Sequence, residues 1–495
     1  MDVHKNSNFL AFDFGAESGR ALLGTLDGGK LHLREIHRFP NCPVWTLGHL
    51  HWDVLKLFDE VKHGLKIALD QTGGDLDGIG VDTWGVDFGL FSEDGELLGN
   101  PFHYRDERTN GMLEAVTEIV PREEIFEHTG IQFIQVNTLY QLYSMVLTGS
   151  TALKCASTLL FTPDLFNYWL TGQMTSEYSI ATTSQCYDPR KGDWATEILD
   201  KLGIPTGIFQ KVVQPGTTIG CLASTLAREL GAGECVPVVA PACHDTGSAV
   251  AAVPSTEECP VYISSGTWSL MGAELDKPLI NENARQMGFA NEGGVAGTIR
   301  FLHNIMGLWL VQECRRTWLA AGEDVSYAEL ARMAEASDGF VSVVDPDAGV
   351  FLTPGDMPER IRQFCRETGQ NVPESKGEVV RCALDSLALR YRDTMEKLDE
   401  LLEKRFDRIH IVGGGTQNTL LCQLAADATG RTVVAGPVEA TAIGNVLVQA
   451  MGRGVVGSLA EVREIVRSSF EMVTYEPHPS GVIDRAYETF KHVAS

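Results

Sequence analysis

The sequence has no long apolar run. No segment approaches the roughly 18 consecutive apolar residues that a membrane-spanning helix requires. Its first ten residues, MDVHKNSNFL, also lack the basic segment followed by an apolar stretch that is typical of a secretory signal. These absences exclude a membrane partner, and we expect a cytoplasmic protein.

Basic residues are scarce relative to acidic ones. The chain has 40 Lys and Arg against 66 Asp and Glu, a formal net charge of −26. Nucleic acids are bound through clustered Lys and Arg, so this balance excludes them as partners. A nucleotide would need local relief from the negative field, either from a metal ion or from backbone N–H groups that point at its phosphates.

The eleven cysteines follow no Cys-x-x-Cys or Cys/His metal-binding spacing. Cys365 and Cys382 are a pair that can form a bond under some conditions. Because disulfides do not persist in a reducing cytoplasm, we expect scattered or buried thiols and no structural role for a bond between these two.

Both common nucleotide-binding motifs, the Walker A loop and the Rossmann Gly-x-Gly-x-x-Gly turn, are missing. Three other glycine-rich turns each follow an apolar strand-like segment: FGAESG (14–19), SSGTWS (264–269) and VGGGTQN (412–418). A glycine turn lets backbone N–H groups approach a phosphate, because no Cβ blocks the way. We expect two of these turns to hold phosphates from opposite sides of a cleft and the triple glycine to contact a purine ring.

The chain is too long for a single core, so two large domains are expected. Apolar patterning predicts a strand at 8–15, two strands within 20–39 and a helix at 52–69. A further strand run covers 77–91 and turns at 93–96 into another strand.

The layout of strand, small polar turn and strand recurs at residues 259–275, which predicts an internal structural repeat. Before it, residues 233–258 read as a strand, a polar turn and an Ala-rich helix, and Pro254–Thr256 is the candidate domain boundary. A long amphipathic helix across 380–402 leads into a strand at 409–412. The predicted fold class is α/β, with domains at 1–254 and 255–495.

Two carboxylates stand beside these turns. Asp13 ends the first strand, and Asp245 lies in ACHDTGSA. Such a pair suits phosphoryl transfer, in which one Asp positions Mg²⁺ through its waters and the other accepts the proton of an attacking hydroxyl. Two structural alternatives stay open: Asp13 capping a turn, and Asp245 capping the helix that follows it.

Three more residues are candidates for a sugar site. His244 either contacts substrate or is simply packed. In one interpretation Trp84 and Gly85 form the floor of the site: the aromatic face packs against C–H groups of the sugar, and glycine gives access to the backbone. In the other interpretation Trp84 belongs to the core.

Ten separated segments together resemble the FGGY carbohydrate kinases, in the order of that family and over residues 8–450. They are FDFGAESGR, GVDTWGVDFGL, YRDERT, TPDLFNYWLTG, HDTGSAV, YISSGTWSLMG, NEGG, HNIMGLWLVQ, IHIVGGGTQN and GPVEATAIGN.

This resemblance implies two ribonuclease-H-like, actin-type domains with an active-site cleft between them: a sugar-binding domain at 1–254 and a nucleotide-binding domain at 255–495. It also implies ATP and Mg²⁺ as cofactors, a ketose with a reactive primary hydroxyl as acceptor, and a monomer or small homo-oligomer.

Carried over residue by residue, the resemblance implies Asp245 as the catalytic base and Asp13 with Asp245 near the metal. The implied nucleotide-binding residues are Ala16, Glu17, Ser18, Gly19, Arg20, Thr267, Gln312 and Gly414. The implied substrate-binding residues are Gly85, His244, Asp245, Thr246 and Asn304.

The chain departs from the family pattern in two places. Many relatives carry a pair of hydroxyl residues where this chain has Ala16 and Glu17, so Ser18 and the backbone must suffice for the phosphates, or Glu17 must point to solvent. The branch of the family that this chain resembles most already has Ala at the first position. Glu17 is therefore the one departure of this turn from that branch. The Arg-Glu pair that glycerol kinases place in the sugar site is replaced by DTWGVDF, which disfavours glycerol.

Two kinds of alternative stay open. A kinase of the same family acting on another acceptor, such as fuculose, xylulose or gluconate, would keep the chemistry and change only the pocket. ATP-dependent chaperones and filament proteins share the actin-like fold and use ATP as a conformational switch, but they lack an Asp placed to deprotonate a sugar.

Overall fold

The computed structural model describes residues 6–233 and 235–494. The chain forms two compact units that alternate along the sequence. Unit 1 contains the described residues up to Thr256 together with Glu274–Phe301 and Ala440–Ser469. Unit 2 contains Glu257–Ala273, Leu302–Glu439 and the described residues from Phe470 onward. The division into functional domains at 254/255 stays a prediction.

Unit 1 is built on a six-stranded sheet. Strand β1 lies near its centre, antiparallel to β2 and parallel to β6, so the strands predicted at 8–15 and within 20–39 are confirmed. The strand order is β13 (Thr218–Cys221), β14 (Pro237–Val239), β6 (Gly78–Thr83), β1 (Ser7–Phe14), β2 (Ser18–Asp27) and β3 (Lys30–Pro40). All of β6 and most of β1 are buried, as expected of strands that are covered on both faces.

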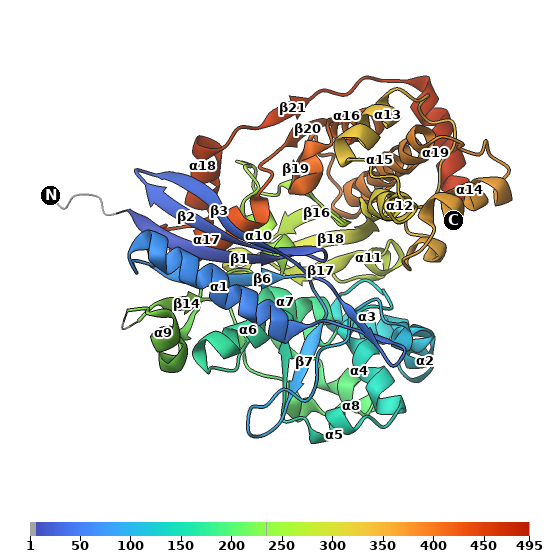
Figure 1. Ribbon diagram of the computed structural model, residues 1–495. Helices are drawn as coiled ribbons and strands as arrows, with labels where there is room; N and C mark the ends of the chain where they lie inside the picture. The colour runs from blue at the N-terminus through green and yellow to red at the C-terminus, as the bar shows by residue number, and fades with distance from the viewer. Residues whose placement is uncertain (1–5, 234, 495) are drawn as a thin grey trace. The chain divides into compact units, whose positions relative to one another are not determined.

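Helices cover both faces of this sheet (Figure 1). The predicted helix is α1 (Val54–Thr72), which begins at an Asp53 cap and packs an apolar stripe on one face. Helix α17 (Ala440–Gly452) covers the other face. It approaches the backbone of β6 closely, because a Cβ on Gly80 would lie only 2.6 Å from the Asn445 Oδ1. Residues far along the chain therefore complete the core of unit 1.

Helix α10 (Asp245–Ala251) packs against α17, and this contact depends on Gly444. A Cβ there would lie 1.8 Å from the carbonyl oxygen of Ser248, which belongs to the backbone and cannot move aside cheaply. We expect Gly444→Ala to lower the free energy of unfolding by about 1–3 kcal/mol, the usual cost of overpacking. Denaturant unfolding measures it. Gly481→Ala is the matched control, because its Cβ would meet nothing closer than an Arg485 side-chain atom at 3.6 Å. Equal stability of the two variants would contradict the prediction.

The predicted strand run over 77–91 is wrong as one strand. β6 ends at Thr83, and the chain resumes as β7 (Phe88–Phe91), which pairs with β8 (Thr158–Phe161) in a separate sheet. Between them Val86 has φ of +69°, a conformation that a β-branched residue rarely adopts. After the turn at 93–96, Leu97 makes only an isolated bridge with Phe91 rather than a strand.

The remaining elements of unit 1 surround these sheets. They are β4 (Val44–Thr46), β5 (His49–His51), α2 (Met112–Ile119), α3 (Arg122–Thr129), α4 (Thr138–Leu147), α5 (Thr151–Cys155), α6 (Thr162–Thr171), β9 (Ser176–Glu177), α7 (Tyr178–Ala181), β10 (Tyr187–Asp188), β11 (Asp193–Trp194), α8 (Thr196–Lys201), β12 (Val212–Val213), α9 (Ser224–Leu230), α11 (Glu282–Gln286), β17 (Ala290–Gly293) and α18 (Leu459–Ser469), with 3₁₀ turns at Glu107–Thr109, Thr182–Ser184, Thr206–Ile208 and Val295–Gly297.

Unit 2 repeats the strand pairing of unit 1. Here β15 (Val261–Ser265) is antiparallel to β16 (Trp268–Leu275) and parallel to β19 (Arg408–Val412). The pairing matches that of β1 with β2 and β6, so the predicted internal repeat is confirmed in topology. The sheet continues with β20 (Thr432–Ala435) and β21 (Val473–Tyr475) beyond β19, and with β18 (Ile299–Met306) and then β17 beyond β16. The last residues of β16 and the first of β18 are assigned to unit 1.

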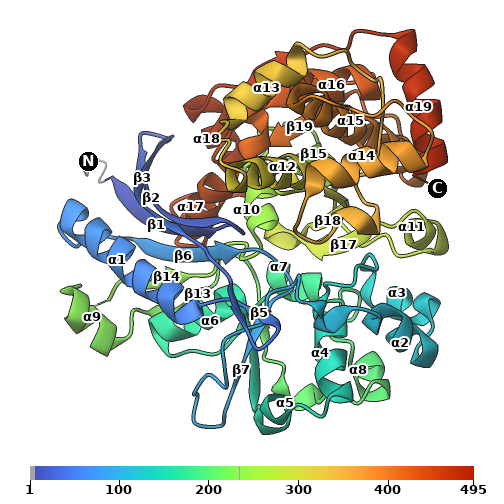
Figure 2. The same cartoon turned by 45° about the vertical axis from the view of Figure 1, so that its right-hand side comes forward.

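Helices of unit 2 gather around β19 (Figure 2). The long predicted helix is α15 (Lys376–Leu401), which opens with a capping box between Ser375 and Glu378. The others are α12 (Trp309–Ala320), α13 (Tyr327–Glu335), α14 (Met357–Glu367), α16 (Thr419–Thr429) and α19 (Gly481–Val493), with 3₁₀ turns at Gly349–Phe351 and Gly414–Gln417. Among the described residues no helix combines the length and the apolar character needed to cross a membrane.

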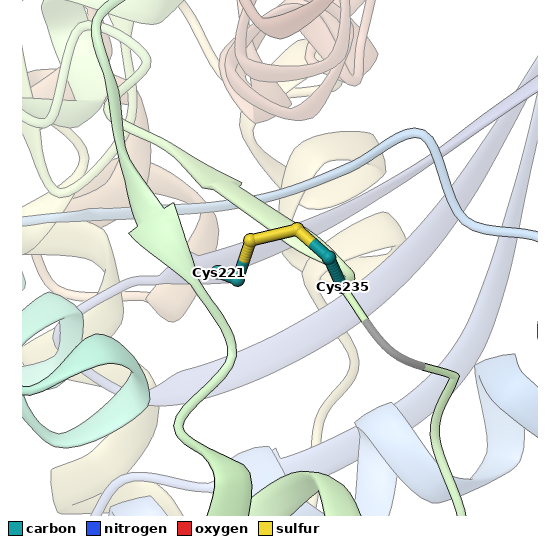
Figure 3. Close-up of a disulfide and its surroundings, with 2 residues drawn as sticks. All are labelled: Cys221 and Cys235. Atoms are coloured by element: carbon teal, nitrogen blue, oxygen red, sulfur yellow. A yellow bond between two sulfur atoms is a disulfide. The ribbon is translucent and has the colours of Figure 1, made fainter.

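The expectation of scattered or buried thiols is wrong for Cys221 and Cys235. Cys221 ends β13, Cys235 stands just before β14, and the two sulfur atoms are bonded (Figure 3). The antiparallel pairing of these strands brings the two Cα atoms to 5.2 Å, a distance that a disulfide spans. Cys365 and Cys382 are buried and free, although a hydrogen bond from Cys382 lowers the pKa of Cys365.

Candidate active site

The first glycine-rich turn joins β1 to β2 and brings Asp13 opposite Arg20. The two residues are partners in the antiparallel register, and an Arg20 Nη2 atom lies 2.5 Å from the Asp13 Oδ2. The carboxylate that we expected to face a metal–nucleotide therefore already has a cation from its own hairpin. Among the described residues the other oxygen, Oδ1, has no such partner.

Asn41 holds the shape of this turn. The Gly15 N–H donates to the Ser18 carbonyl at 2.9 Å, the Asn41 side chain donates to the Gly15 carbonyl at 2.9 Å, and the Asn41 N–H donates to the Glu17 carbonyl at 3.0 Å. Glu17 itself is exposed, in line with the expectation that it points to solvent.

Asp82, which the sequence analysis did not single out, lies beside Asp13 in the parallel register of β1 and β6. Its side chain is fully buried, and Oδ2 accepts a hydrogen bond from the Asn445 Nδ2 at 2.6 Å. Burial raises the pKa of Asp82 well above its ordinary value, and the charges of Asp13 and Asp245 raise it further. Acidic residues at the ends of two adjacent strands were a visible pattern that could have identified it.

The raised pKa of Asp82 predicts a pH-dependent stability. A carboxyl whose pKa is higher in the folded state stabilises the fold below its ordinary pKa, near 3.8, and loses that contribution as the pH rises through the raised value. We expect Asp82→Asn to raise the Tm by roughly 2–4 °C at pH 8, the shift that about 1 kcal/mol produces in a domain of this size. The gain should shrink on acidification. Thermal unfolding between pH 5 and pH 8 measures it, and a Tm difference that does not change with pH would contradict the assignment.

Asp245 is the first residue of α10. Its Oδ1 accepts hydrogen bonds from the Thr246 N–H and, at 3.0 Å, from the Thr246 hydroxyl. The side chain keeps 31% of its surface exposed, so a substrate hydroxyl can reach it. Burial of its surroundings raises the pKa of Asp245, whereas the neighbouring His244 lowers it.

His244 connects Asp245 to a buried ion pair. Its Nε2 lies 3.4 Å from the Asp245 Oδ1, and its Nδ1 lies 3.1 Å from both the Glu292 Oε2 and the Arg300 Nη2. Arg300 Nη1 is 3.1 Å from the same Glu292 oxygen, and Arg300 Nε donates to the Gly293 carbonyl at 2.8 Å. Sequence reasoning missed both residues. Arg300 stands in no turn or motif, and Glu292 lay within the NEGG segment, which served only the family resemblance.

Gly85 approaches this group closely. A Cβ at Gly85 would lie 3.4 Å from the His244 Nε2 and 3.3 Å from the Thr183 side chain, so a larger residue would crowd the ring. Trp84 instead belongs to the core: it is 7% exposed, its ring centre lies 4.1 Å from that of Trp52, and its Nε1 donates to Asp87 at 2.9 Å.

The other candidate residues lie in unit 2. The Thr267 carbonyl accepts hydrogen bonds from the Gly307 and Trp309 N–H groups at the start of α12. In that helix the Gln312 Oε1 is buried and has no hydrogen-bond partner among the described residues. No heavy atom lies within 4 Å of where a Gly414 Cβ would stand, so this backbone is open, and Asn304 lies in β18.

Unit 1 thus brings together the predicted residues Asp13, Arg20, Gly85, His244 and Asp245, and it adds Asp82, Glu292 and Arg300. In the described part of the chain, no group of three or more His, Cys, Asp or Glu side chains is arranged to hold a metal ion.

Comparison with known proteins gives the family of the chain. The model of the N-terminal domain of the FGGY family of carbohydrate kinases matches residues 8–252, and that of the C-terminal domain matches residues 261–453. A rhamnulokinase from Bacteroides thetaiotaomicron is 44% identical over 485 residues, which are 98% of this chain and 99% of the relative. A rhamnulokinase from Oceanobacillus iheyensis is 41% identical over 466 residues, covering 94% and 97%.

Among solved structures, a gluconate kinase from Lactobacillus acidophilus superposes with a TM-score of 0.79 at 15% identity and covers 99% of this chain and 97% of its own. A xylulose kinase from the same organism gives the same TM-score and identity, covering 98% and 97%. These likenesses confirm the predicted mixed α/β kinase fold. With both family domains matched and relatives above 40% identity over nearly the full length, the chain belongs to the FGGY family of carbohydrate kinases.

Proposed function

We propose that this kinase transfers the γ-phosphoryl group of ATP to the C1 hydroxyl of L-rhamnulose, giving L-rhamnulose 1-phosphate in rhamnose catabolism. The observation that carries the proposal is the full-length similarity, at 44% identity, to a protein named rhamnulokinase. The family membership implies a sugar and ATP as substrates, and the identity of the sugar is the proposed part.

Asp245 is the proposed catalytic base. It stands at the start of a helix, partly exposed, and two donors from Thr246 fix its Oδ1. In the proposed reaction it accepts the proton of the C1 hydroxyl while that oxygen bonds to phosphorus and the ADP oxygen leaves. The transition state is loose, so the proton need not leave early, and a carboxylate of modest basicity suffices.

The proposed nucleotide contacts are the ones that the family resemblance implied. The turn from Ala16 to Arg20, held by Asn41, offers backbone N–H groups to phosphate oxygens. Thr267 offers a second phosphate contact. The open backbone at Gly414 and the Gln312 Oε1, which no described residue pairs, suit contacts with the nucleoside.

Magnesium fits the residues near Asp13. Carboxylate oxygens are its preferred ligands, it keeps several waters, and Asp13 has one oxygen outside its salt bridge. We propose that Asp13 and Asp245 hold Mg²⁺ through such waters. When bound, the ion offsets negative charge on the transferring phosphoryl group, which matters in a chain with a net charge of −26.

The proposed acceptor contacts are Gly85, His244, Thr246 and Asn304, with the sugar bound mainly by residues 1–254 and the nucleotide by residues 255–495. We also propose a cytoplasmic monomer or small homo-oligomer. The second candidate acceptors are L-fuculose and D-xylulose. A solved xylulose kinase has the same fold.

The test is a panel of ketoses. ADP release with L-rhamnulose, L-fuculose and D-xylulose ranks the acceptors by kcat/KM, and we expect L-rhamnulose to lead by at least about tenfold, since a site built to bind particular hydroxyls discriminates well beyond that. A higher kcat/KM for another ketose would replace the proposed substrate. ATP turnover that is indifferent to every sugar would favour an ATP-driven switch protein instead.

A further inference from the structure

The ring of His244 has one nitrogen in the interior of unit 1 and the other beside a partly exposed carboxylate. Its Nδ1 lies 3.1 Å from an oxygen of Glu292 and 3.1 Å from a nitrogen of Arg300, and both of these side chains are buried. Its Nε2 lies 3.4 Å from the Oδ1 of Asp245, whose side chain is partly exposed. The two ring nitrogens therefore have different surroundings, and only the Nε2 side borders the candidate active site.

The contact between Arg300 and His244 decides which ring nitrogen carries the hydrogen. The Arg300 Nη2 is aligned with Nδ1 as a hydrogen bond at 3.1 Å, and because a guanidinium group only donates, Nδ1 is the acceptor. The Glu292 oxygen is equally close, but it is not aligned to accept a hydrogen bond from Nδ1. The hydrogen of the neutral ring therefore lies on Nε2.

The backbone of His244 is also fixed by hydrogen bonds. Its N–H donates to the Ser179 hydroxyl at 3.0 Å, and that hydroxyl donates to a Glu177 oxygen at 2.6 Å. Glu177 is fully buried, and the same oxygen accepts the N–H of Cys243 at 3.0 Å. Since backbone and ring are both held, the fold sets the direction of the Nε2–H before any ligand binds.

There is room for a ligand atom beside Nε2. Gly85 has no side chain, and a Cβ there would stand 3.4 Å from Nε2 and 3.3 Å from the Thr183 side chain. The Asp245 Oδ1, at 3.4 Å, is beyond the usual length of an N–H···O hydrogen bond. Among the described residues Nε2 has no hydrogen-bond partner, and it is not one of the unpaired polar atoms shielded from solvent, so a ligand atom can reach it.

We infer that Arg300 is a positioning residue that fixes this tautomer of His244, so that the Nε2–H donates a hydrogen bond to an oxygen of the acceptor sugar. This inference rests on the proposed function. It also separates the tasks of two neighbouring side chains. Because Nε2 already carries a hydrogen, it cannot take up the proton of the reacting hydroxyl, and that task is left to Asp245.

NMR of the ring nitrogens tests the tautomer without any sugar. The full chain is labelled with ¹⁵N in its histidine rings, and the His244 signals are identified by their absence from His244→Ala. We expect a hydrogen on Nε2 and none on Nδ1, because the Arg300 donor occupies the Nδ1 lone pair. A hydrogen on Nδ1 would overturn the inference.

Kinetics test whether the tautomer matters for the sugar. Glu292→Gln together with Arg300→Met removes both charges at once, which avoids leaving one of them buried and unpaired. A Gln amide can donate to Nδ1 or accept from it, so it imposes no tautomer. We expect the KM for the ketose to rise about tenfold, near the upper end of what one hydrogen bond contributes, while the KM for ATP changes less than about twofold.

The matched control is Glu274→Gln together with Arg463→Met. This change removes another buried ion pair of unit 1, and its kinetic constants should match those of wild type. The Glu292 and Arg300 changes are also made in His244→Ala. There they should cause no further rise in the ketose KM, because the ring through which Arg300 acts is gone.

Two kinetic results would overturn the inference: an unchanged ketose KM in the Glu292 and Arg300 double variant, or a rise of the same size when His244 is absent. If the double variant does not fold, the NMR measurement on wild type decides. A wild-type protein that phosphorylates no ketose would refute the proposed function instead, and the tautomer measured without sugar would still test the role of Arg300.

Discussion

Asp245→Asn is expected to lower kcat for ketose phosphorylation by about 1,000-fold, because a positioned general base contributes typically 10²–10⁴-fold. Asparagine has nearly the same shape and can still accept a hydrogen bond from the Thr246 hydroxyl, which Asp245 receives at 3.0 Å. It cannot take up a proton at neutral pH. The loss should therefore fall on kcat, and ATP binding should remain.

Sugar-dependent ADP release measures the loss, and binding of ATP to the variant is measured separately. Asp94→Asn is the matched control: it is the same chemical change at an exposed turn of unit 1, and its kcat should equal that of wild type. Survival of kcat within a few-fold in Asp245→Asn would mean that another group accepts the proton, and the assignment of the base would then be wrong.

Arg300→Met is expected to lower the free energy of unfolding by about 3–5 kcal/mol, the usual cost of breaking a buried ion pair from one side. Arg300 is fully buried, and its removal leaves the Glu292 carboxylate without its 3.1 Å partner and the Gly293 carbonyl without its donor. Denaturant unfolding at constant pH measures the change.

A double variant makes this prediction specific. Glu292→Gln together with Arg300→Met removes both charges, so it should recover much of the lost stability, since an uncompensated buried charge is the main cost. Lys491→Met removes one partner of an exposed pair with Glu488 and should change stability little. If Arg300→Met were as mild as Lys491→Met, the ion pair would not support the fold around His244.

The residues that the sequence identified share a recognisable local context. Asp13 and Asp245 each stand beside a small polar turn or at the start of a helix, and both patterns can be read without knowledge of distant contacts. The strands around Asp13 were equally visible, because an apolar run that ends in glycine predicts a buried strand.

What the sequence could not reveal depends on contacts between distant segments. Arg20 was assigned to the nucleotide, yet the register of its own hairpin pairs it with Asp13. Glu292 and Arg300 acquire a role only when β17 and β18 reach His244. The Cys221–Cys235 bond follows from the pairing of β13 with β14 around an intervening helix, and cysteine spacing alone does not indicate it.

Prediction from the apolar pattern also failed where the backbone adopts an unusual conformation. The segment at 77–91 is apolar enough to read as one strand, but Val86 turns the chain out of the first sheet. A β-branched residue in that conformation contradicts its intrinsic preference, and departures of this kind are expected at functional or strained sites.

The position of α17 has a consequence for how the chain matures during synthesis. Asn445 in α17 donates a hydrogen bond to Asp82, 363 residues earlier in the sequence. Helix α17 covers one face of the six-stranded sheet, and all strands of that sheet are synthesised before it. A nascent chain leaving the ribosome carries that sheet long before its cover exists, with a glycine-lined, carboxylate-bearing surface open to other molecules. We expect such late closure by a distant segment to slow folding, because contacts between residues far apart in sequence form late and leave surface exposed until then.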